Sequence, residues 1–174
     1  GRRDDEEFPA ILVKDSSITF ASSTLENYNG RGLKLVNSSS AIEEVNFLGS
    51  GINISTVGIE IEGGSPIVKN SEIKNNRNGI YMELFAEEDL PVIEGNNLED
   101  NEKAIYTLSP NVILKSNRGE NNQINGILLF SNVSQNLTWF KNELPYIIGE
   151  PPLTGGIVGV DLDRTLTIEP GVRI

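Results

Sequence analysis

The chain has 174 residues, enough for one sizeable core, and its 25 acidic against 14 basic residues give a formal net charge of −11. It contains no His and no Cys, which excludes disulfides, thiolate chemistry, His-ligated metals and a Ser-His-Asp triad. The acidic balance argues against nucleic acids and anionic membranes as partners, and no run approaches the ~18 apolar residues of a membrane span. We therefore expect no nucleic-acid partner and no membrane insertion by this segment.

Residues 1–9 begin with a charged run, Gly1-Arg-Arg-Asp-Asp-Glu-Glu. This composition is typical of a disordered leader or of residues added for expression. The chain has no initiator Met and no apolar signal core. We interpret it as a piece of a longer protein, so that an upstream targeting signal would lie outside it.

One short phrase then recurs along the chain. Its copies start at Gly32, Gly58, Gly79, Ala104 and Gly126, with intervals of 26, 21, 25 and 22 residues. A period of this length with an alternating apolar tetrapeptide predicts a β-solenoid, in which each repeat forms one coil. The second and fourth residues of each copy are expected to face the core: Leu33 and Leu35, Ile59 and Ile61, Ile80 and Met82, Ile105 and Thr107, and Ile127 and Leu129.

Between these copies the chain reads as short strands separated by Gly, Pro and Asn turns, and no helix of consequence is expected. The pairs Asn75-Asn76, Asp100-Asn101 and Asn121-Asn122 recur at one corner. They predict an asparagine ladder that satisfies the turn backbone. The alternative is Ca²⁺ bound by Glu99 and Asp100, but Asn brings no charge and no Asp-x-Asp-x-Asp-Gly loop occurs. We predict no metal site and no cofactor, with Ca²⁺ as the alternative.

A second wall of the core is expected from Ile73 and Leu98, one coil apart, with Phe47 and Trp139 as further members. Gly119 falls at the next position of this wall, where an apolar side chain is needed. The coil that contains Gly119 is therefore predicted to be irregular.

The phrase Gly58-Ile-Glu-Ile, followed by Pro66-Ile67, Asn70, Ile73, Asn75-Asn76 and Gly79-Ile80, resembles the right-handed parallel β-helix repeat family with its pectate-lyase-like fold. This resemblance covers residues 10–148. It implies an all-β, single-stranded, right-handed parallel β-helix of about 6–7 coils of 21–26 residues.

Residues 139–174 resemble the junction between two β-helix blocks of a large multi-block surface protein. The resemblance is carried by Trp139, Pro145-Tyr-Ile-Ile and Thr165-Leu-Thr-Ile-Glu-Pro-Gly. It implies a linker and the start of a following block over residues 149–174. Further β-helix blocks of the same chain are then expected partners, at an extracellular or cell-surface location.

The third residue of each phrase is expected to point outward, in a stripe of Lys34, Glu60, Tyr81, Tyr106 and Leu128, with Glu62 and Glu83 one step further along the strand. Tyr81, Tyr106, Glu60, Glu62 and Glu83 would form an exposed aromatic–acidic strip. Aromatic rings pack on sugars and carboxylates accept hydrogen bonds from hydroxyls, so a neutral glycan is the expected ligand. The alternative is that the tyrosines are stacked outward-facing strand residues that only stabilise the sheet.

An enzyme is the alternative function. Glu60 and Glu83 could approach each other as a carboxylate pair, with or without Ca²⁺, as in a polysaccharide lyase, epimerase or hydrolase, or in its inactive relative. The clustered Asp residues, Gly-His-Gly and Arg-Ile-Lys of the polygalacturonase-like hydrolases do not occur. We therefore favour a non-catalytic extracellular or cell-surface segment that acts as a spacer and an adhesion surface, with a glycan or another surface protein as partner. Four sequons, at Asn37, Asn53, Asn132 and Asn136, predict glycosylation if the protein is secreted by a eukaryote.

Overall fold

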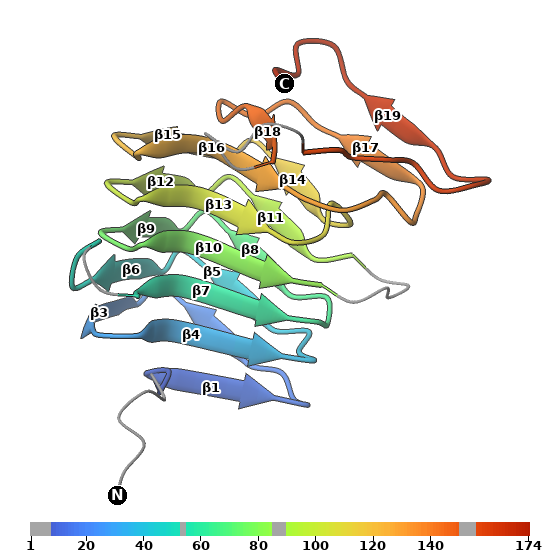
Figure 1. Ribbon diagram of the computed structural model, residues 1–174. Coiled ribbons are helices and arrows are strands. Elements are labelled where there is room, and N and C mark those ends of the chain that lie inside the picture. Colours follow the sequence, from blue (N-terminus) through green and yellow to red (C-terminus); the bar gives the residue numbers. More distant parts are fainter. Residues whose placement is uncertain (1–7, 53–54, 85–89, 150–155) are drawn as a thin grey trace, which may run out of the picture.

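The computed structural model describes residues 8–52, 55–84, 90–149 and 156–174 (Figure 1). These residues form nineteen short β-strands and no helix, as the sequence predicts. Accordingly, the described part of the chain contains no helix that is long and apolar enough to cross a membrane.

Three parallel sheets run along the molecule. Sheet A contains β1 (Ile11–Lys14), β4 (Arg31–Val36), β7 (Val57–Glu62), β10 (Asn78–Glu83), β13 (Lys103–Thr107), β16 (Ile124–Leu129) and β18 (Tyr146–Ile148). Sheet B contains β2 (Thr19–Ala21), β5 (Ala41–Glu43), β8 (Ile67–Lys69), β11 (Val92–Glu94) and β14 (Ile113–Lys115). Sheet C contains β3 (Thr24–Tyr28), β6 (Asn46–Gly49), β9 (Glu72–Lys74), β12 (Asn97–Glu99) and β15 (Arg118–Glu120).

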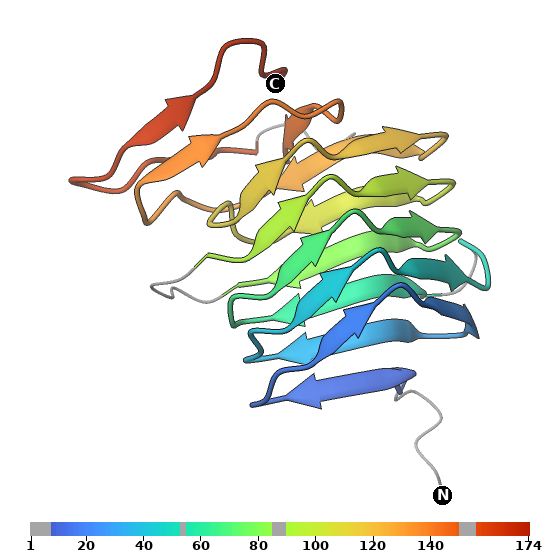
Figure 2. The same cartoon turned by 180° about the vertical axis from the view of Figure 1, so that it is seen from behind.

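From β1 to β15 each turn of the chain adds one strand to each of the three sheets, so the molecule is a parallel β-solenoid of about 6 turns (Figures 1 and 2). The repeated phrase sets the register, because Ile59 pairs with Ile80 and Ile80 pairs with Ile105 on successive strands of sheet A. The predicted coil count and the predicted pairing of the phrases are both confirmed.

The core consists of apolar columns that run along the solenoid. All ten side chains that the phrase assigns to the interior are fully buried, including Thr107. Phe47, Ile73 and Leu98 stack in the same way behind sheet C. Each fully buried aliphatic side chain contributes about 1.5–3 kcal/mol of transfer free energy, so the columns supply the main stabilisation of the rod.

The first residue of the phrase also faces the interior. A Cβ atom added to Gly58 would lie 2.6 Å from the Ile73 Cγ2 atom and 2.6 Å from the Gly79 carbonyl oxygen. The corner between sheets C and A is therefore too tight for most side chains. This explains why four of the five copies begin with Gly and the fifth, at position 104, with Ala.

The predicted asparagine ladder is confirmed at this corner. Asn76, Asn101 and Asn122 are buried. The backbone N–H of Asn76 donates to Asn101 Oδ1 over 3.0 Å, and that of Asn101 donates to Asn122 Oδ1 over 2.9 Å. The residues that precede them adopt the left-handed conformation, at φ 58°, 55° and 57° for Asn75, Asp100 and Asn121. The exposed Asp100 turns the chain, and Glu99 forms an ion pair with Lys74 over 2.8 Å.

A second ladder, which the sequence analysis did not predict, lies at the corner between sheets B and C. The backbone N–H of Ser71 donates to Asn96, that of Asn96 donates to Asn117, and that of Asn117 donates to Asn142, over 3.0, 3.1 and 2.9 Å. The residues before Ser71, Asn96 and Asn117 again have positive φ angles. Both corners thus use the same device, a left-handed residue followed by a buried amide or hydroxyl.

The irregularity predicted at Gly119 is present, and Leu144 compensates for it. Gly119 pairs with Leu98, and a Cβ atom added to it would lie 2.7 Å from the Leu144 Cδ2 atom. Leu144, from the next coil, is buried and belongs to the core cluster. A side chain from the following turn therefore fills the space that Gly119 leaves.

The solenoid changes at its last described turns. β17 (Leu137–Trp139) pairs with β19 (Leu166–Ile168) in a two-stranded parallel sheet at the C-terminal end (Figure 1). The Trp139 ring stacks on the Tyr146 ring at 4.8 Å and 7°. The Tyr146 backbone N–H donates to the Arg173 carbonyl oxygen over 2.9 Å, so residues near the C-terminus contact the last strand of sheet A.

Candidate functional site

Two rows of side chains cover the outer face of sheet A. The predicted row follows the register Lys34, Glu60, Tyr81, Tyr106 and Leu128 along the strands. A second row consists of the residues that precede the phrase, in the register Arg31, Val57, Asn78 and Lys103. The two rows are three positions apart along each strand, for example Val57 and Glu60. Both residues between them, here Gly58 and Ile59, face the interior, so the two rows lie on the same outer face.

Glu60 is buried, which corrects the expectation of an exposed carboxylate. Its residue exposure is 3%, although it points away from the core. Arg31 Nε binds Glu60 Oε2, and Lys34 Nζ binds Glu60 Oε1 over 2.9 Å. The cost of removing this charge from water is offset because both carboxylate oxygens have cationic partners.

Lys34 links Glu60 to Glu62, so it contacts two carboxylates and not only Glu60. Burial alone would lower the pKa of Lys34, but the hydrogen bonds and charges of Glu62 and Glu60 outweigh it and raise that pKa. Burial would likewise raise the pKa of Glu62, but the hydrogen bond that Lys34 donates to it, together with the charges of Lys34 and Arg31, lowers that pKa. Arg31, Lys34, Glu60 and Glu62 thus form one charge network, which we call the ionic cluster.

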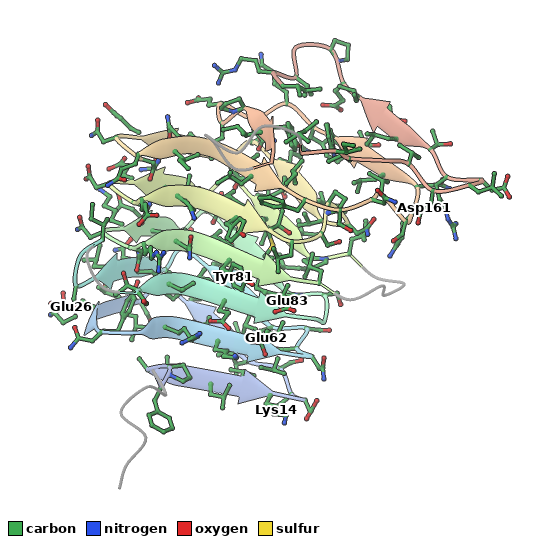
Figure 3. All side chains as sticks on the ribbon, in the orientation of Figure 1. Lys14, Glu26, Glu62, Tyr81, Glu83 and Asp161 are labelled. Atoms are coloured by element: carbon green, nitrogen blue, oxygen red, sulfur yellow. The ribbon has the colours of Figure 1, made fainter. Side chains whose placement is uncertain are left out.

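Glu83 lies at the edge of this cluster. It pairs in register with Glu62, and Figure 3 shows Glu62, Tyr81 and Glu83 close together over β7 and β10. Among the residues that the structure describes, Glu83 has no cation within 4 Å. Its carboxylate therefore stands beside a like charge with no ion pair of its own.

Aromatic rings cover the next coils of the face. The Tyr81 and Tyr106 ring centroids are 5.5 Å apart with an interplanar angle of 46°, and both residues are partly exposed. Phe130 meets Tyr106 edge-on at 5.4 Å and 79°. The Lys103 Nζ atom lies 5.0 Å from the Tyr106 ring centroid, in a cation–π contact. We call Tyr81, Tyr106 and Phe130 the aromatic cluster.

Leu128 does not belong to an exposed stripe. It pairs in register with Tyr106 and so faces outward, but it is fully buried and lies outside the core cluster. The accessible part of the predicted row is therefore limited to the tyrosines and their charged neighbours.

A shallow hollow of about 240 Å³ opens between the two rows. Three neighbouring strands line it, with Arg31 from β4, Glu60 from β7, and Asn78 and Tyr81 from β10, together with Arg77 and Ser55. It presents guanidinium, amide and hydroxyl groups together. Such a mixture can donate to and accept from a polyhydroxylated ligand.

The repeated phrase predicts one shared face for Tyr81, Tyr106, Glu60, Glu62 and Glu83, and the structure places all five there on β7, β10 and β13. Arg31, Lys103 and Phe130 also lie at this site and were not predicted. The signal for Arg31 and Lys103 was present, because both residues immediately precede a copy of the phrase. Among the described residues, no group of three or more acidic side chains is arranged to hold a metal ion.

A family model described as a right-handed beta helix region matches residues 9–147, which is most of the chain. The chain belongs to this family. No curated protein and no solved structure matches the chain. Family membership accounts for the solenoid of this β-helix and for its repeat, and it assigns no specific function.

Three of the four sequons lie on described parts of the β-helix, and all three asparagines are exposed. The Nδ2 atom of Asn37 donates to Asp15, and that of Asn132 donates to Asp161, over 3.1 and 3.2 Å. Asn136 instead accepts a hydrogen bond from the Thr165 backbone N–H through Oδ1. Asn53 lies outside the described residues, and use of the sequons stays a prediction.

Proposed function

We propose that this β-helix is a non-catalytic segment of an extracellular or cell-surface protein, where it acts as a spacer and as an adhesion surface for a neutral glycan. The observation that carries the proposal is the pair of partly exposed rings, Tyr81 and Tyr106, 5.5 Å apart on the face of sheet A. Aromatic rings of this kind pack against the apolar faces of sugars, while adjacent polar groups bind the hydroxyls.

The hollow beside Tyr81 supports the same ligand class. Arg77, Asn78 and Ser55 contribute donors and acceptors at its wall, next to the ring. A sugar ring stacked on Tyr81 would direct its hydroxyls toward these groups and toward Glu83. Because the coils repeat in register, a second sugar unit would meet Tyr106.

The state of Glu60 supports a binding function over an enzymatic one. In the alternative function, Glu60 and Glu83 act on a glycosidic bond or on a sugar ring. A catalytic carboxylate needs a free oxygen at the reacting atom, whereas both Glu60 oxygens are engaged by Arg31 and Lys34. Polysaccharide chemistry remains the second candidate function, and the experiment below tests it alongside binding.

The distribution of apolar surface supports the role as a spacer with further β-helix blocks as partners. Of the large apolar side chains exposed in the described residues, all but Ile67 lie in the first or the last turn: Phe8, Leu12, Ile157, Val160, Leu162, Ile168 and Ile174. The sides of the rod instead carry charged and polar residues. Further coils stacked at either end would cover these side chains.

A panel of neutral and acidic polysaccharides tests the proposal. We expect saturable binding of a neutral glycan that Tyr81→Ala combined with Tyr106→Ala reduces at least about tenfold, the scale of losing aromatic contacts. Leu12→Ala, an exposed truncation on the same sheet, is the control and should bind like the unmodified chain. Thermal unfolding of each variant confirms that it folds.

The same panel distinguishes the alternative. A Ca²⁺-dependent rise in the absorbance of unsaturated sugar products, abolished by Glu83→Gln, would identify a lyase and overturn the non-catalytic proposal. Binding with no turnover supports the proposal, and no binding to any glycan contradicts it.

A further inference from the structure

The aromatic cluster on sheet A does not form a flat platform. Tyr81 is tilted by 46° to Tyr106, and Phe130 stands at 79° to Tyr106, with centroid separations of 5.5 and 5.4 Å. Rings at such angles present their faces in different directions. These separations and angles are those of aromatic rings packed on one another, so a ligand has no space between them. Tyr81 and Tyr106 are partly exposed, however, and an open ring face can attract a cation because it carries negative charge density.

The carboxylate beside these rings has no cationic partner. Glu83 pairs in register with Glu62, and like charges directly opposite each other on neighbouring strands destabilise a sheet. Lys34 compensates Glu60 and Glu62 from the coil before, and no described cation lies within 4 Å of Glu83. The repulsion between Glu62 and Glu83 would be relieved if a cation were bound next to Glu83.

The negative potential of these carboxylates reaches the ring of Tyr81. Burial raises the pKa of Tyr81, and the charges of Glu83, Tyr106, Glu60 and Glu62 raise it further. A neighbouring ring already accepts a cation within the chain, because the Lys103 ammonium lies 5.0 Å from the centroid of Tyr106. The face is thus suited to an ammonium group both electrostatically and by the chemistry of its rings.

An organic cation fits this site better than a metal ion does. Ca²⁺ takes six to eight oxygen ligands, whereas the described residues contain no group of three or more acidic side chains arranged to hold a metal ion. Quaternary ammonium groups, by contrast, are bound by aromatic rings supported by a carboxylate.

We propose that Tyr81, Tyr106 and Glu83 bind an organic ammonium group. The group belongs either to a small choline-like molecule or to a lysine side chain of a partner protein. This function goes beyond glycan binding and does not depend on it, because an ammonium group has no need of the hollow lined by Arg31 and Arg77. An ammonium ligand and a sugar would, however, compete for the faces of the tyrosine rings.

Titration of the full chain with tetramethylammonium, choline and N-acetyl-lysine amide tests the proposal, with tyrosine fluorescence and amide chemical shifts as readouts. We expect saturable changes at β10 and β13 for at least one of these cations. Glu83→Gln keeps the shape of the side chain and removes its charge, and it should weaken binding about tenfold. Glu120→Gln makes the same change on the outer face of sheet C and should leave binding unchanged.

Saturation by choline alone assigns a small-molecule ligand, and saturation by the lysine amide alone assigns a protein partner. No saturable change with any of the three cations would overturn the proposal, as would equal binding by the Glu83→Gln and Glu120→Gln variants. A neutral glycan that still binds in that event leaves the glycan proposal intact, so the two proposals can fail separately.

Discussion

A buried asparagine serves a solenoid well because its side chain both donates and accepts across the coil spacing. Asn101 shows the full set of contacts: its Oδ1 accepts from Asn76 N over 3.0 Å, and its Nδ2 donates to the Ile73 carbonyl and to Asn122 Oδ1, each over 3.0 Å. The side chain therefore satisfies backbone groups of the corner that strand pairing leaves unpaired. The charge of an aspartate at this position would be unfavourable, because the residue is almost fully buried.

We predict that Asn101→Ala lowers the free energy of unfolding by about 2–3 kcal/mol. The expected loss reflects the buried Asn76 N–H and Ile73 carbonyl, which would lose their partners. Urea denaturation followed by circular dichroism measures the change. Asn46→Ala, an exposed asparagine of sheet C, is the control and should change stability by less than about 0.5 kcal/mol. Equal effects of the two substitutions would contradict the structural role of the ladder.

At the scale of strands, the repeated phrase identified the core columns correctly because alternation and coil register are local properties. Ile59 and Ile61 face inward whatever surrounds them, since a strand alternates its side chains. The first ladder was also predictable, because its asparagines come in visible pairs. The second ladder was missed because its residues, Ser71, Asn96 and Asn117, follow three different residue types.

The environment of the outward residues could not be predicted in the same way. The burial of Glu60 depends on Arg31 and Lys34, which are 29 and 26 residues away along the chain. Coil lengths vary between copies of the phrase, so only the folded register shows which cations reach which carboxylates. The prediction that Glu60 points outward is confirmed, and the prediction that it is exposed is wrong.

The glycine that begins the phrase gives a prediction for a single strand. Gly58→Ala places a methyl group 2.6 Å from the Ile73 side chain and from the Gly79 carbonyl. We expect a loss of about 2 kcal/mol in the free energy of unfolding, the cost of overpacking a core. Ser55→Ala, exposed and three residues before Gly58, is the control for chemical denaturation. An unchanged midpoint for Gly58→Ala would show that the corner can widen to accept a methyl group.

For the whole molecule, contacts between coils determine stability, since the described strands pair with strands of neighbouring turns. Ion pairs on the surface also join neighbouring coils. Glu94 binds Lys69 and Lys115 of the adjacent coils over 3.1 and 3.7 Å, and Lys74 bridges Glu72 and Glu99. Exposed pairs contribute little individually. Their larger effect is on register, because a shifted coil would place like charges together.

A buried tyrosine lies at one end of each asparagine ladder. These two tyrosines make the stability of the solenoid depend on pH. Tyr28 Oη donates to Asn76 Oδ1 over 2.9 Å at one ladder, and Asn142 Nδ2 donates to Tyr146 Oη over 3.1 Å at the other. Burial raises the pKa of both hydroxyls well above the ordinary value, and their hydrogen bonds only partly oppose this. In the folded chain they stay protonated under conditions in which the unfolded chain ionises.

We therefore predict that the β-helix loses stability in base. A group whose pKa is raised by folding makes its full contribution to the free energy of unfolding below its pKa in the unfolded chain. That contribution falls as the pH rises toward its pKa in the folded chain. The loss should begin near pH 10, the ordinary pKa of tyrosine, with Lys34 and Lys74 adding to it because folding raises their pKa as well. Tyr28→Phe should cost about 1 kcal/mol at pH 7, where Asn76 loses a donor, yet flatten the decline above pH 10. Unfolding midpoints between pH 7 and 11.5 measure both effects, and a decline as steep as that of the unmodified chain would show that Tyr28 is not one of the groups responsible.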